Sequence, residues 1–293
     1  MGENRSIDWE HALRRARNHA PFLARALDRQ PDLAALLAEG EGEAALAWAR
    51  AQGGGDDAEG ALRRERLALA AALAVGDLAG AFPLTQVVGE LTAFADRALD
   101  RAIRTAIAER TDSDTAHGFI ALALGKQGAG ELNYSSDIDP ILLFDRERLA
   151  RRATDDPGDA AQRYARRIVA LLSSSTADGY ALRVDLRLRP NSEVSPLCVP
   201  VGSAMTHYQG HALAWERAAF TRARAAAGDM AAGEDFLSQI RPFVWRAQLD
   251  FGAIEEISAL THRIRHSHEG PPAPGPGFDV KRGRGGIREI EFY

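Results

Sequence analysis

Two aspartates separated by one residue, Asp137 and Asp139, have a spacing that could support metal chemistry. The apolar run at 138–144 predicts a buried strand, and strand residues two apart point to the same face of a sheet. Two adjacent carboxylates repel each other unless a cation lies between them. Hard oxygen ligands of this kind suit Mg²⁺. The pair alone does not separate a metal site from a polar turn that caps a strand.

A third aspartate, Asp185, lies in the alternating stretch at 180–190, which predicts another strand. Its apolar positions, Val184, Leu186 and Leu188, would share one face, and its polar positions, Arg183, Asp185, Arg187 and Arg189, the other. A carboxylate among arginines can be a salt-bridged surface. If this strand lies beside the aspartate pair, however, three carboxylates could hold two Mg²⁺ ions that clamp the attacking and leaving oxygens at a phosphorus centre. The arginines would then face the phosphates.

The glycine-rich stretch at 125–130 follows an apolar run and contains Lys126, one of two lysines in the chain. Backbone N–H groups in such a turn can approach a triphosphate closely, which predicts a phosphate-binding role for Gly125 and Lys126. The stretch is not a Walker A motif, because Gln127 follows the lysine. A tight strand-to-helix turn without a ligand explains it equally well.

The elements that must position these residues fall into three predicted domains. Residues 1–110 read as a helical region, with Asp8 as a helix N-cap and a long helix from about 84 to 110. Residues 111–200 read as an α+β domain with strands at 118–125, 138–144 and 180–190 and a helix at 159–177. Residues 201–293 read as helical, with one helix to about 227, a second from 235 to 268, and a Pro/Gly-rich loop at 269–278.

The composition excludes several classes of protein. A formal net charge of -5 gives no global signal for nucleic-acid binding. One cysteine, Cys198, excludes an internal disulfide and fits the cytoplasm. The polar N-terminus is not a signal peptide, and no apolar run is long enough to span a membrane. Because the chain stops abruptly on an apolar stretch, we expect it to be truncated.

The order of glycine turn, Asp-x-Asp and later third aspartate is similar to the DNA polymerase β-type nucleotidyltransferase superfamily. More narrowly, four long segments resemble the glutamine synthetase adenylyltransferase/adenylyl-removing enzyme family: LGKQGAGELNYSSDID, DGYALRVDLRLRP, AWERAAFTRARAAAGD and VKRGRGGIREIEF. They extend from about residue 120 to the end of the chain. The resemblance implies an α+β fold with a polymerase β-like mixed sheet, flanked by N-terminal and C-terminal helical regions.

The resemblance also implies roles for individual residues. Asp137, Asp139 and Asp185 match the family's catalytic metal ligands for Mg²⁺. The expected nucleotide- and phosphate-binding residues are Gly125, Lys126, Ser135, Ser136, Arg187 and Arg189. The late segment matches at Lys281, Gly285, Gly286, Glu289 and Glu291, with structural and functional roles equally open. Pro140 departs from the aliphatic residue usual in the family and indicates a strand edge or a bulge, since proline donates no ladder hydrogen bond.

Members of this family have tandem nucleotidyltransferase halves. One half transfers AMP from ATP to a tyrosine of glutamine synthetase, and the other removes it by phosphorolysis and releases ADP. The segments RPFVWRAQLDFGAIEEI and GGIREIEF resemble the N-terminal, adenylyl-removing half, whereas FDVKRGRGG leans toward the other half. We therefore expect AMP removal, with the adenylylating half and a catalytically silent nucleotide-binding module as alternatives. The implied partners are glutamine synthetase, ADP or ATP, phosphate and a PII-type regulatory protein.

Overall fold

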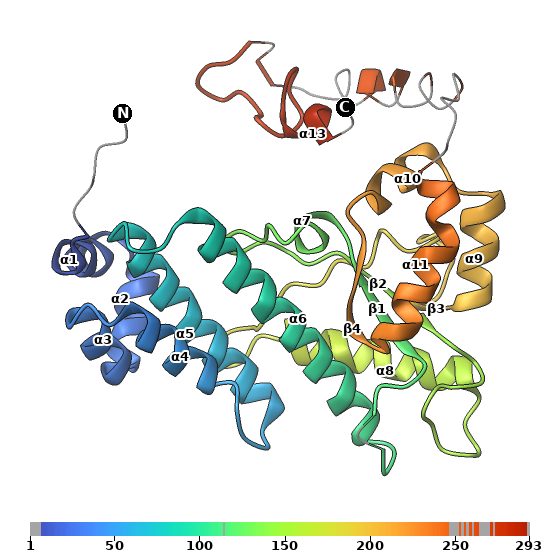
Figure 1. Ribbon diagram of the computed structural model, residues 1–293, viewed down its shortest axis with the longest axis horizontal. Helices are drawn as coiled ribbons and strands as arrows, with labels where there is room; N and C mark the ends of the chain where they lie inside the picture. Colours follow the sequence, from blue (N-terminus) through green and yellow to red (C-terminus); the bar gives the residue numbers. More distant parts are fainter. Residues whose placement is uncertain are drawn as a thin grey trace.

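The computed structural model describes residues 7–113, 115–245, 252, 255, 258–259, 261–263, 270–271 and 273–291. The chain passes from a set of N-terminal helices into a small sheet and then into further helices (Figure 1). The predicted α+β class is therefore confirmed. None of the helices in the described ranges is long and apolar enough to cross a membrane.

The N-terminal helices are α1 (Trp9–His19), α2 (Pro21–Arg29), α3 (Pro31–Ala38), α4 (Gly42–Ala51), α5 (Ala58–Leu78) and α6 (Leu84–Ala108). Asp8 caps α1 as predicted, because its side chain accepts a hydrogen bond of 2.9 Å from the N–H of His11. Prolines at the first positions of α2 and α3 suit helix starts, where the missing N–H is not needed. The predicted long helix is α6, which packs against α5.

The sheet has the order β3-β2-β1-β4. Its strands are β1 (Phe119–Ala123), β2 (Pro140–Phe144), β3 (Cys198–Pro200) and β4 (Arg224–Gly228). Central β1 runs antiparallel to both β2 and β4, while β2 and β3 are parallel. Pro140 lies at the first position of β2, a central strand, so the expectation of a strand edge there is wrong.

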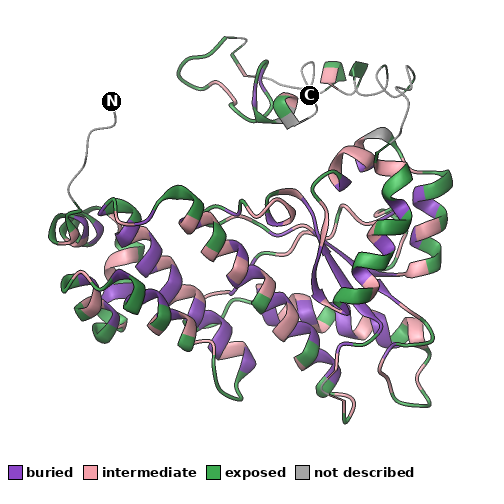
Figure 2. Cartoon of the chain, viewed as in Figure 1, coloured by how far each residue is buried: buried purple, intermediate pink, exposed green. Residues whose placement is uncertain are grey.

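Helices cover both faces of the sheet. The remaining elements are α7 (Gly125–Gly128), α8 (Pro157–Ser173), α9 (Val201–Gly210), α10 (Ala214–Phe220), α11 (Met230–Val244) and α13 (Ile287–Glu291). Phe119 and Ala121 of β1 join a core that includes α6 and α8, whereas Ile120 and Leu122 join a core with α9 and α11. The strands are accordingly buried along their length, and the helices turn their exposed sides outward (Figure 2).

Two predictions about local structure are wrong. The stretch at 180–190 is not a strand, because it pairs only at an isolated parallel bridge between Ile138 and Val184 and then turns. Residues 224–228 form β4 rather than a helix. Small side chains allow close packing there: a Cβ on Gly233 of α11 would come within 2.8 Å of the Ala225 side chain. Sheet pairing thus overrides the helix propensity of alanine.

Helix bounds also shift. The predicted helix at 159–177 is α8 and ends at Ser173, and the one predicted from 235 begins at Met230. Most of its predicted continuation to 268, including the segment at 246–251, lies outside the described residues. The division into domains at 110 and 200 stays a prediction. The first hydrophobic core, however, runs continuously from α1 to β2 and α8.

Candidate functional site

The three aspartates lie where β2 begins, beside the bridge to the segment after α8. The N–H of Ile138 donates to the carbonyl of Arg183 at 3.0 Å, and the carbonyl of Ile138 accepts from the N–H of Asp185 at 2.9 Å. This parallel register sets Asp185 beside Asp139 and Arg183 beside Asp137. The structure therefore brings the three carboxylates together without the second full strand that we expected.

Asp139 is the carboxylate most affected by this arrangement. Burial, followed by the charges of Asp185 and Asp137, raises the pKa of Asp139 to about 6, against opposing effects of Lys281 and Arg187. No side chain or N–H group in the described part of the chain donates a hydrogen bond to it. A half-buried carboxylate next to two others, with no donor of its own, is a favourable place for a cation.

The other two aspartates each meet an arginine. Arg183 pairs with Asp137, and Arg187 pairs with Asp185, its Nε lying 2.9 and 2.8 Å from the two carboxylate oxygens. The Arg187 side chain lowers the pKa of Asp185, while partial burial opposes it. Within the described ranges, no three carboxylate, imidazole or thiolate groups are already arranged to hold a metal ion. Both arginines are exposed, so they can turn away without breaking the core.

The predicted phosphate turn is the short helix α7, next to the aspartates. Gly125 has φ +57°, and a Cβ there would lie 3.4 Å from Oδ2 of Asp139. Buried Gln127 anchors the turn by donating to Asp96 of α6 at 2.9 Å. Lys126 is exposed on α7. The turn thus brings backbone close to Asp139 and leaves the Lys126 side chain exposed beside it.

The predicted serines hold the loop before the aspartate pair. Ser135 has φ 56°, and its hydroxyl accepts from Nη1 of Arg183 at 3.3 Å, while its carbonyl accepts from Nη2. The Ser136 hydroxyl donates to the side chain of Asn133. Both hydroxyls already have protein partners, so phosphate binding by Ser135 and Ser136 stays a prediction.

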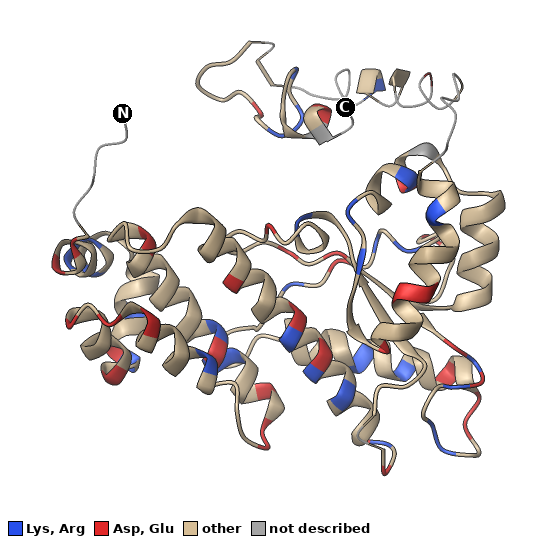
Figure 3. Cartoon of the chain, viewed as in Figure 1, with Lys and Arg blue, Asp and Glu red and all other residues tan. Residues whose placement is uncertain are grey.

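Arg189 holds the loop that follows Asp185. Its guanidinium donates to the carbonyls of Leu186 at 2.7 Å, Ser192 at 2.6 Å, Pro196 at 3.1 Å and Ser195 at 3.2 Å. These bonds favour a structural role, whereas phosphate binding by Arg189 stays a prediction. Acidic and basic residues both occur in the loops beside α7 and at the adjacent end of β4 (Figure 3).

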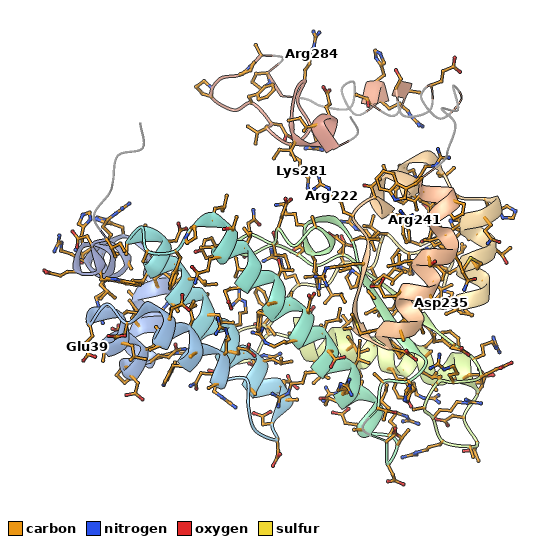
Figure 4. The ribbon with its side chains drawn as sticks, in the orientation of Figure 1. Glu39, Arg222, Asp235, Arg241, Lys281 and Arg284 are labelled. Atoms are coloured by element: carbon orange, nitrogen blue, oxygen red, sulfur yellow. The ribbon has the colours of Figure 1, made fainter. Side chains whose placement is uncertain are left out.

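The late segment approaches the same site. Lys281 lies on the side of this segment that faces the rest of the molecule, near Arg222 in the view of Figure 4. Its charge is near enough to Asp139 to lower the pKa of that carboxyl. A turn follows Lys281, in which the N–H of Gly286 donates to the carbonyl of Gly283 at 2.8 Å, and the N–H of Gly285 donates to the side chain of Glu289 at 2.9 Å. The side chain of Glu291 lies outside the described part.

Sequence reasoning missed two residues that adjoin the site. Tyr180 accepts a hydrogen bond of 2.7 Å from Nη1 of Arg183, and Arg66 of α5 lies over its ring. Tyr180 lies within one of the segments that resemble the family, which was its only available signal. No local pattern could relate Arg66 to Tyr180, because they meet only in the folded chain.

A small mixed sheet flanked by helices, with convergent carboxylates at the start of a central strand and a glycine turn against them, defines a nucleotidyltransferase-like protein. Residues 10–239 match the sequence model of the family described as glutamate-ammonia ligase adenylyltransferase. The chain therefore belongs to this family.

Curated relatives agree with this assignment. The bifunctional glutamine synthetase adenylyltransferase/adenylyl-removing enzyme of Rhizobium meliloti is 41% identical over 244 residues, covering 79% of this chain and 25% of the relative. Enzymes of the same name are 39% identical in Caulobacter vibrioides, over 95% of this chain and 29% of the relative, and 35% identical in Brucella suis, over 100% and 32%. The chain thus spans between a quarter and a third of these relatives' length.

Proposed function

We propose that the chain carries a Mg²⁺-dependent nucleotidyltransferase site that removes AMP from an adenylylated tyrosine of glutamine synthetase by phosphorolysis. The observation that supports it most is the convergence of Asp185 and Asp137 on half-buried Asp139, where burial and then the two neighbouring charges raise the pKa of Asp139 to about 6. The names of the relatives supply the substrate and the two directions of reaction.

The residues at the site fit a divalent cation. Asp139 offers carboxylate oxygens that accept no hydrogen bond from any described residue. Asp137 and Asp185 add further hard oxygen ligands once Arg183 and Arg187 turn aside. Magnesium bound by these three aspartates would supply positive charge to the phosphoryl oxygens and to the departing phenolate. We expect two ions, as in other sites of this chemistry.

The proposed reaction balances without an added base. An oxygen of hydrogen phosphate attacks the α-phosphorus of the tyrosyl-AMP ester, and the bond between phosphorus and the tyrosine oxygen breaks. The products are ADP and tyrosine, and the proton carried by hydrogen phosphate compensates the phenolate, whose pKa is about 10. Once released, Arg183 and Arg187 are placed to bind phosphoryl oxygens, and the α7 turn presents backbone N–H groups without an intervening side chain at Gly125.

The direction of reaction rests on the resemblance of the segments at 241–257 and 285–292 to the adenylyl-removing half. The adenylylating direction would use the same carboxylates, with ATP as donor and pyrophosphate as leaving group. A PII-type regulatory partner is likewise a prediction from the resemblance.

The experiment that tests the function is incubation of the chain with adenylylated glutamine synthetase and Mg²⁺, with and without phosphate. We expect ADP release that requires both phosphate and Mg²⁺. AMP incorporation from ATP into unmodified glutamine synthetase, with no phosphate-dependent ADP release, would instead assign the adenylylating direction. Nucleotide binding that does not depend on metal, with no turnover, would indicate a silent module.

A further inference from the structure

Arg66 lines the pocket beside the site from α5 and has no anionic partner among the described residues. Nearby arginines are paired: Arg63 with Glu59, Arg64 with Asp57 and Arg97 with Glu65. No ion pair or hydrogen bond connects the half-buried guanidinium of Arg66 to any other described residue. A partly desolvated cation without a partner costs free energy, and it is stabilised when an anion binds beside it.

Tyr180 connects Arg66 to the aspartates. The guanidinium carbon of Arg66 lies 4.4 Å from the ring centroid of Tyr180, and that of Arg183 lies 5.6 Å from it. Arg183 in turn pairs with Asp137. The charge of Arg183 is therefore balanced by a carboxylate, whereas that of Arg66 is not.

Two guanidinium groups act on Tyr180, those of Arg66 and Arg183. Burial raises the pKa of the Tyr180 hydroxyl, but a hydrogen bond with Ser135 and the charges of Arg66 and Arg183 outweigh it, so that the pKa is lowered overall. The nearby carboxylate of Asp77 accepts a hydrogen bond of 3.4 Å from the Tyr134 hydroxyl and does not pair with Arg66. Two guanidinium groups that converge on one ring repel each other unless an anion lies near both.

A pocket lies at this point. Its polar wall contains Arg66, Tyr180, Asn133, Ser135 and Ser136, which lead to the aspartate pair, and apolar side chains such as Leu69, Phe94 and Leu132 line the rest. Apolar walls exclude water and strengthen an ion contact at the pocket's mouth.

The position of Arg66 is fixed by its neighbour one turn earlier on α5. Buried Arg63 donates to the carbonyls of Gly179 at 2.8 Å and Leu171 at 3.2 Å, and also to that of Ser174. These bonds attach α5 to the end of α8 and to the loop that leads into Tyr180. The distance between Arg66 and Tyr180 is thus set by a buried attachment and not by surface contacts alone.

We infer that Arg66, with Arg183 and Tyr180, forms a subsite for a phosphoryl oxyanion beside Asp137. The ligand is either free phosphate or the terminal phosphate of ADP, which share this chemistry. In phosphorolysis this subsite would hold the attacking phosphate. That role rests on the proposed function and adds a binding site to it. It gives the N-terminal helical region a direct part in substrate binding.

The test uses Arg66→Gln, with Arg66→Lys as the conservative variant and Arg64→Gln as the matched control on the exposed side of α5. Binding of inorganic phosphate, AMP and ADP to the 293-residue chain is measured by calorimetry in the presence of Mg²⁺. We expect Arg66→Gln to weaken phosphate binding roughly 10-fold or more, as for loss of a charge-assisted hydrogen bond, and to leave AMP binding unchanged. Arg66→Lys should retain part of the affinity, and Arg64→Gln all of it.

Comparing ADP binding with phosphate binding distinguishes the two sources of the anion. If ADP binding weakens while free phosphate binding does not, the subsite holds the terminal phosphate of the nucleotide; if both weaken, it holds either. Phosphate and ADP binding that are both unchanged in Arg66→Gln, or an equal loss in Arg64→Gln, would overturn the subsite.

Kinetics separate this inference from the proposed function. In phosphorolysis, Arg66→Gln should raise KM for phosphate roughly 10-fold with kcat within about a factor of three. ADP release with an unchanged KM for phosphate, together with unchanged ADP binding, would remove the subsite and leave the function standing. If the wild-type chain releases no ADP, the proposed function fails, and the calorimetric arm still decides whether Arg66 binds a phosphoryl oxyanion.

Discussion

The Asp139 carboxylate lies next to two other carboxylates and is half-buried, and these are the conditions under which a charged form is disfavoured. Arginines balance Asp137 and Asp185, so the repulsion remains at Asp139. A bound cation should therefore act first at Asp139, where it reduces the repulsion between carboxylates.

The raised pKa of Asp139 predicts how the stability of the folded chain depends on pH. The folded-state pKa of Asp139 is about 6, above the ordinary value of 3.8, so the folded chain holds this proton more tightly than the unfolded chain. The stabilisation of the fold by the protonated Asp139 carboxyl is therefore fully present below about pH 4 and is lost as the pH rises through about 6. Thermal unfolding at pH 8 without divalent cations should give a higher Tm for Asp139→Asn than for the wild type.

Added Mg²⁺ should reverse that order at pH 8. It should raise the Tm of the wild type and have little effect on Asp139→Asn, because a ligand that binds only the folded state stabilises it. The stabilisation by Mg²⁺ should fade below about pH 6 as Asp139 becomes protonated. Equal stabilisation of both proteins by Mg²⁺ at pH 8 would show that the ion binds elsewhere.

Asp137→Asn should abolish turnover with little change in fold. The side chain is exposed, and the substitution preserves its size while removing the charge that a metal requires. Activity should fall at least about 100-fold, with an unfolding midpoint close to that of the wild type. Asp159→Asn on the exposed side of α8 is the control. More than a few per cent residual activity in Asp137→Asn would contradict the two-ion site.

At the scale of elements, the α7 turn gives the sharpest comparison. Gly125 and Gly130 both have positive φ, +57° and +74°, but only at Gly125 would a Cβ meet another group, Oδ2 of Asp139 at 3.4 Å. Each change to alanine should lower the free energy of unfolding by about 1 kcal/mol through backbone strain alone.

Only Gly125→Ala should also impair the site. We expect it to weaken Mg²⁺ binding and to reduce turnover several-fold or more, because the added methyl group would lie in contact with the Asp139 carboxylate and would cover the backbone that faces phosphate. Urea unfolding measures the shared loss of stability, and calorimetry measures Mg²⁺ affinity. An identical effect of Gly125→Ala and Gly130→Ala on Mg²⁺ affinity would show that α7 does not adjoin the bound ion.

The elements also show where local patterns mislead. Arg224 to Gly228 contains three consecutive alanines, and its helix propensity is high, yet the segment pairs with β1 as an edge strand. The stretch at 180–190 alternates like a strand, yet Arg189 binds the carbonyls of the following loop and turns the chain away. In both cases a tertiary contact decides between conformations of similar local energy.

On the scale of the whole molecule, Arg63 joins the N-terminal helices to the segment that carries the third aspartate. It is 1% exposed and donates to carbonyls of Glu59, Leu171, Ser174 and Gly179. Arg63→Met should lower the free energy of unfolding by about 3 kcal/mol, because it leaves several buried carbonyls without donors.

The measurement is urea unfolding, with Arg64→Met as the control on the exposed side of the same helix. Because the first core is continuous from α1 to α8, we expect one cooperative transition for Arg63→Met at lower urea, and not the separate unfolding of an N-terminal unit. A midpoint equal to that of Arg64→Met would show that the buried bonds of Arg63 do not stabilise the fold.

The sequence by itself determined the features that depend on residue type and short spacing. These features are the N-cap at Asp8, the long helix α6, the buried strands β1 and β2, and the close pair Asp137 and Asp139. Each of these is set by the side chains within a few residues, so periodicity and residue type suffice to predict it.

Only the tertiary structure decided which distant residues meet. The bridge between Ile138 and Val184 places Asp185 beside Asp139, the approach of α5 brings Arg66 over Tyr180, and the packing of β1 draws the alanines of β4 into the sheet. No periodic pattern of residues in the sequence predicts any of these contacts. They depend on the burial of apolar surface shared by segments far apart along the chain, which local propensity does not encode.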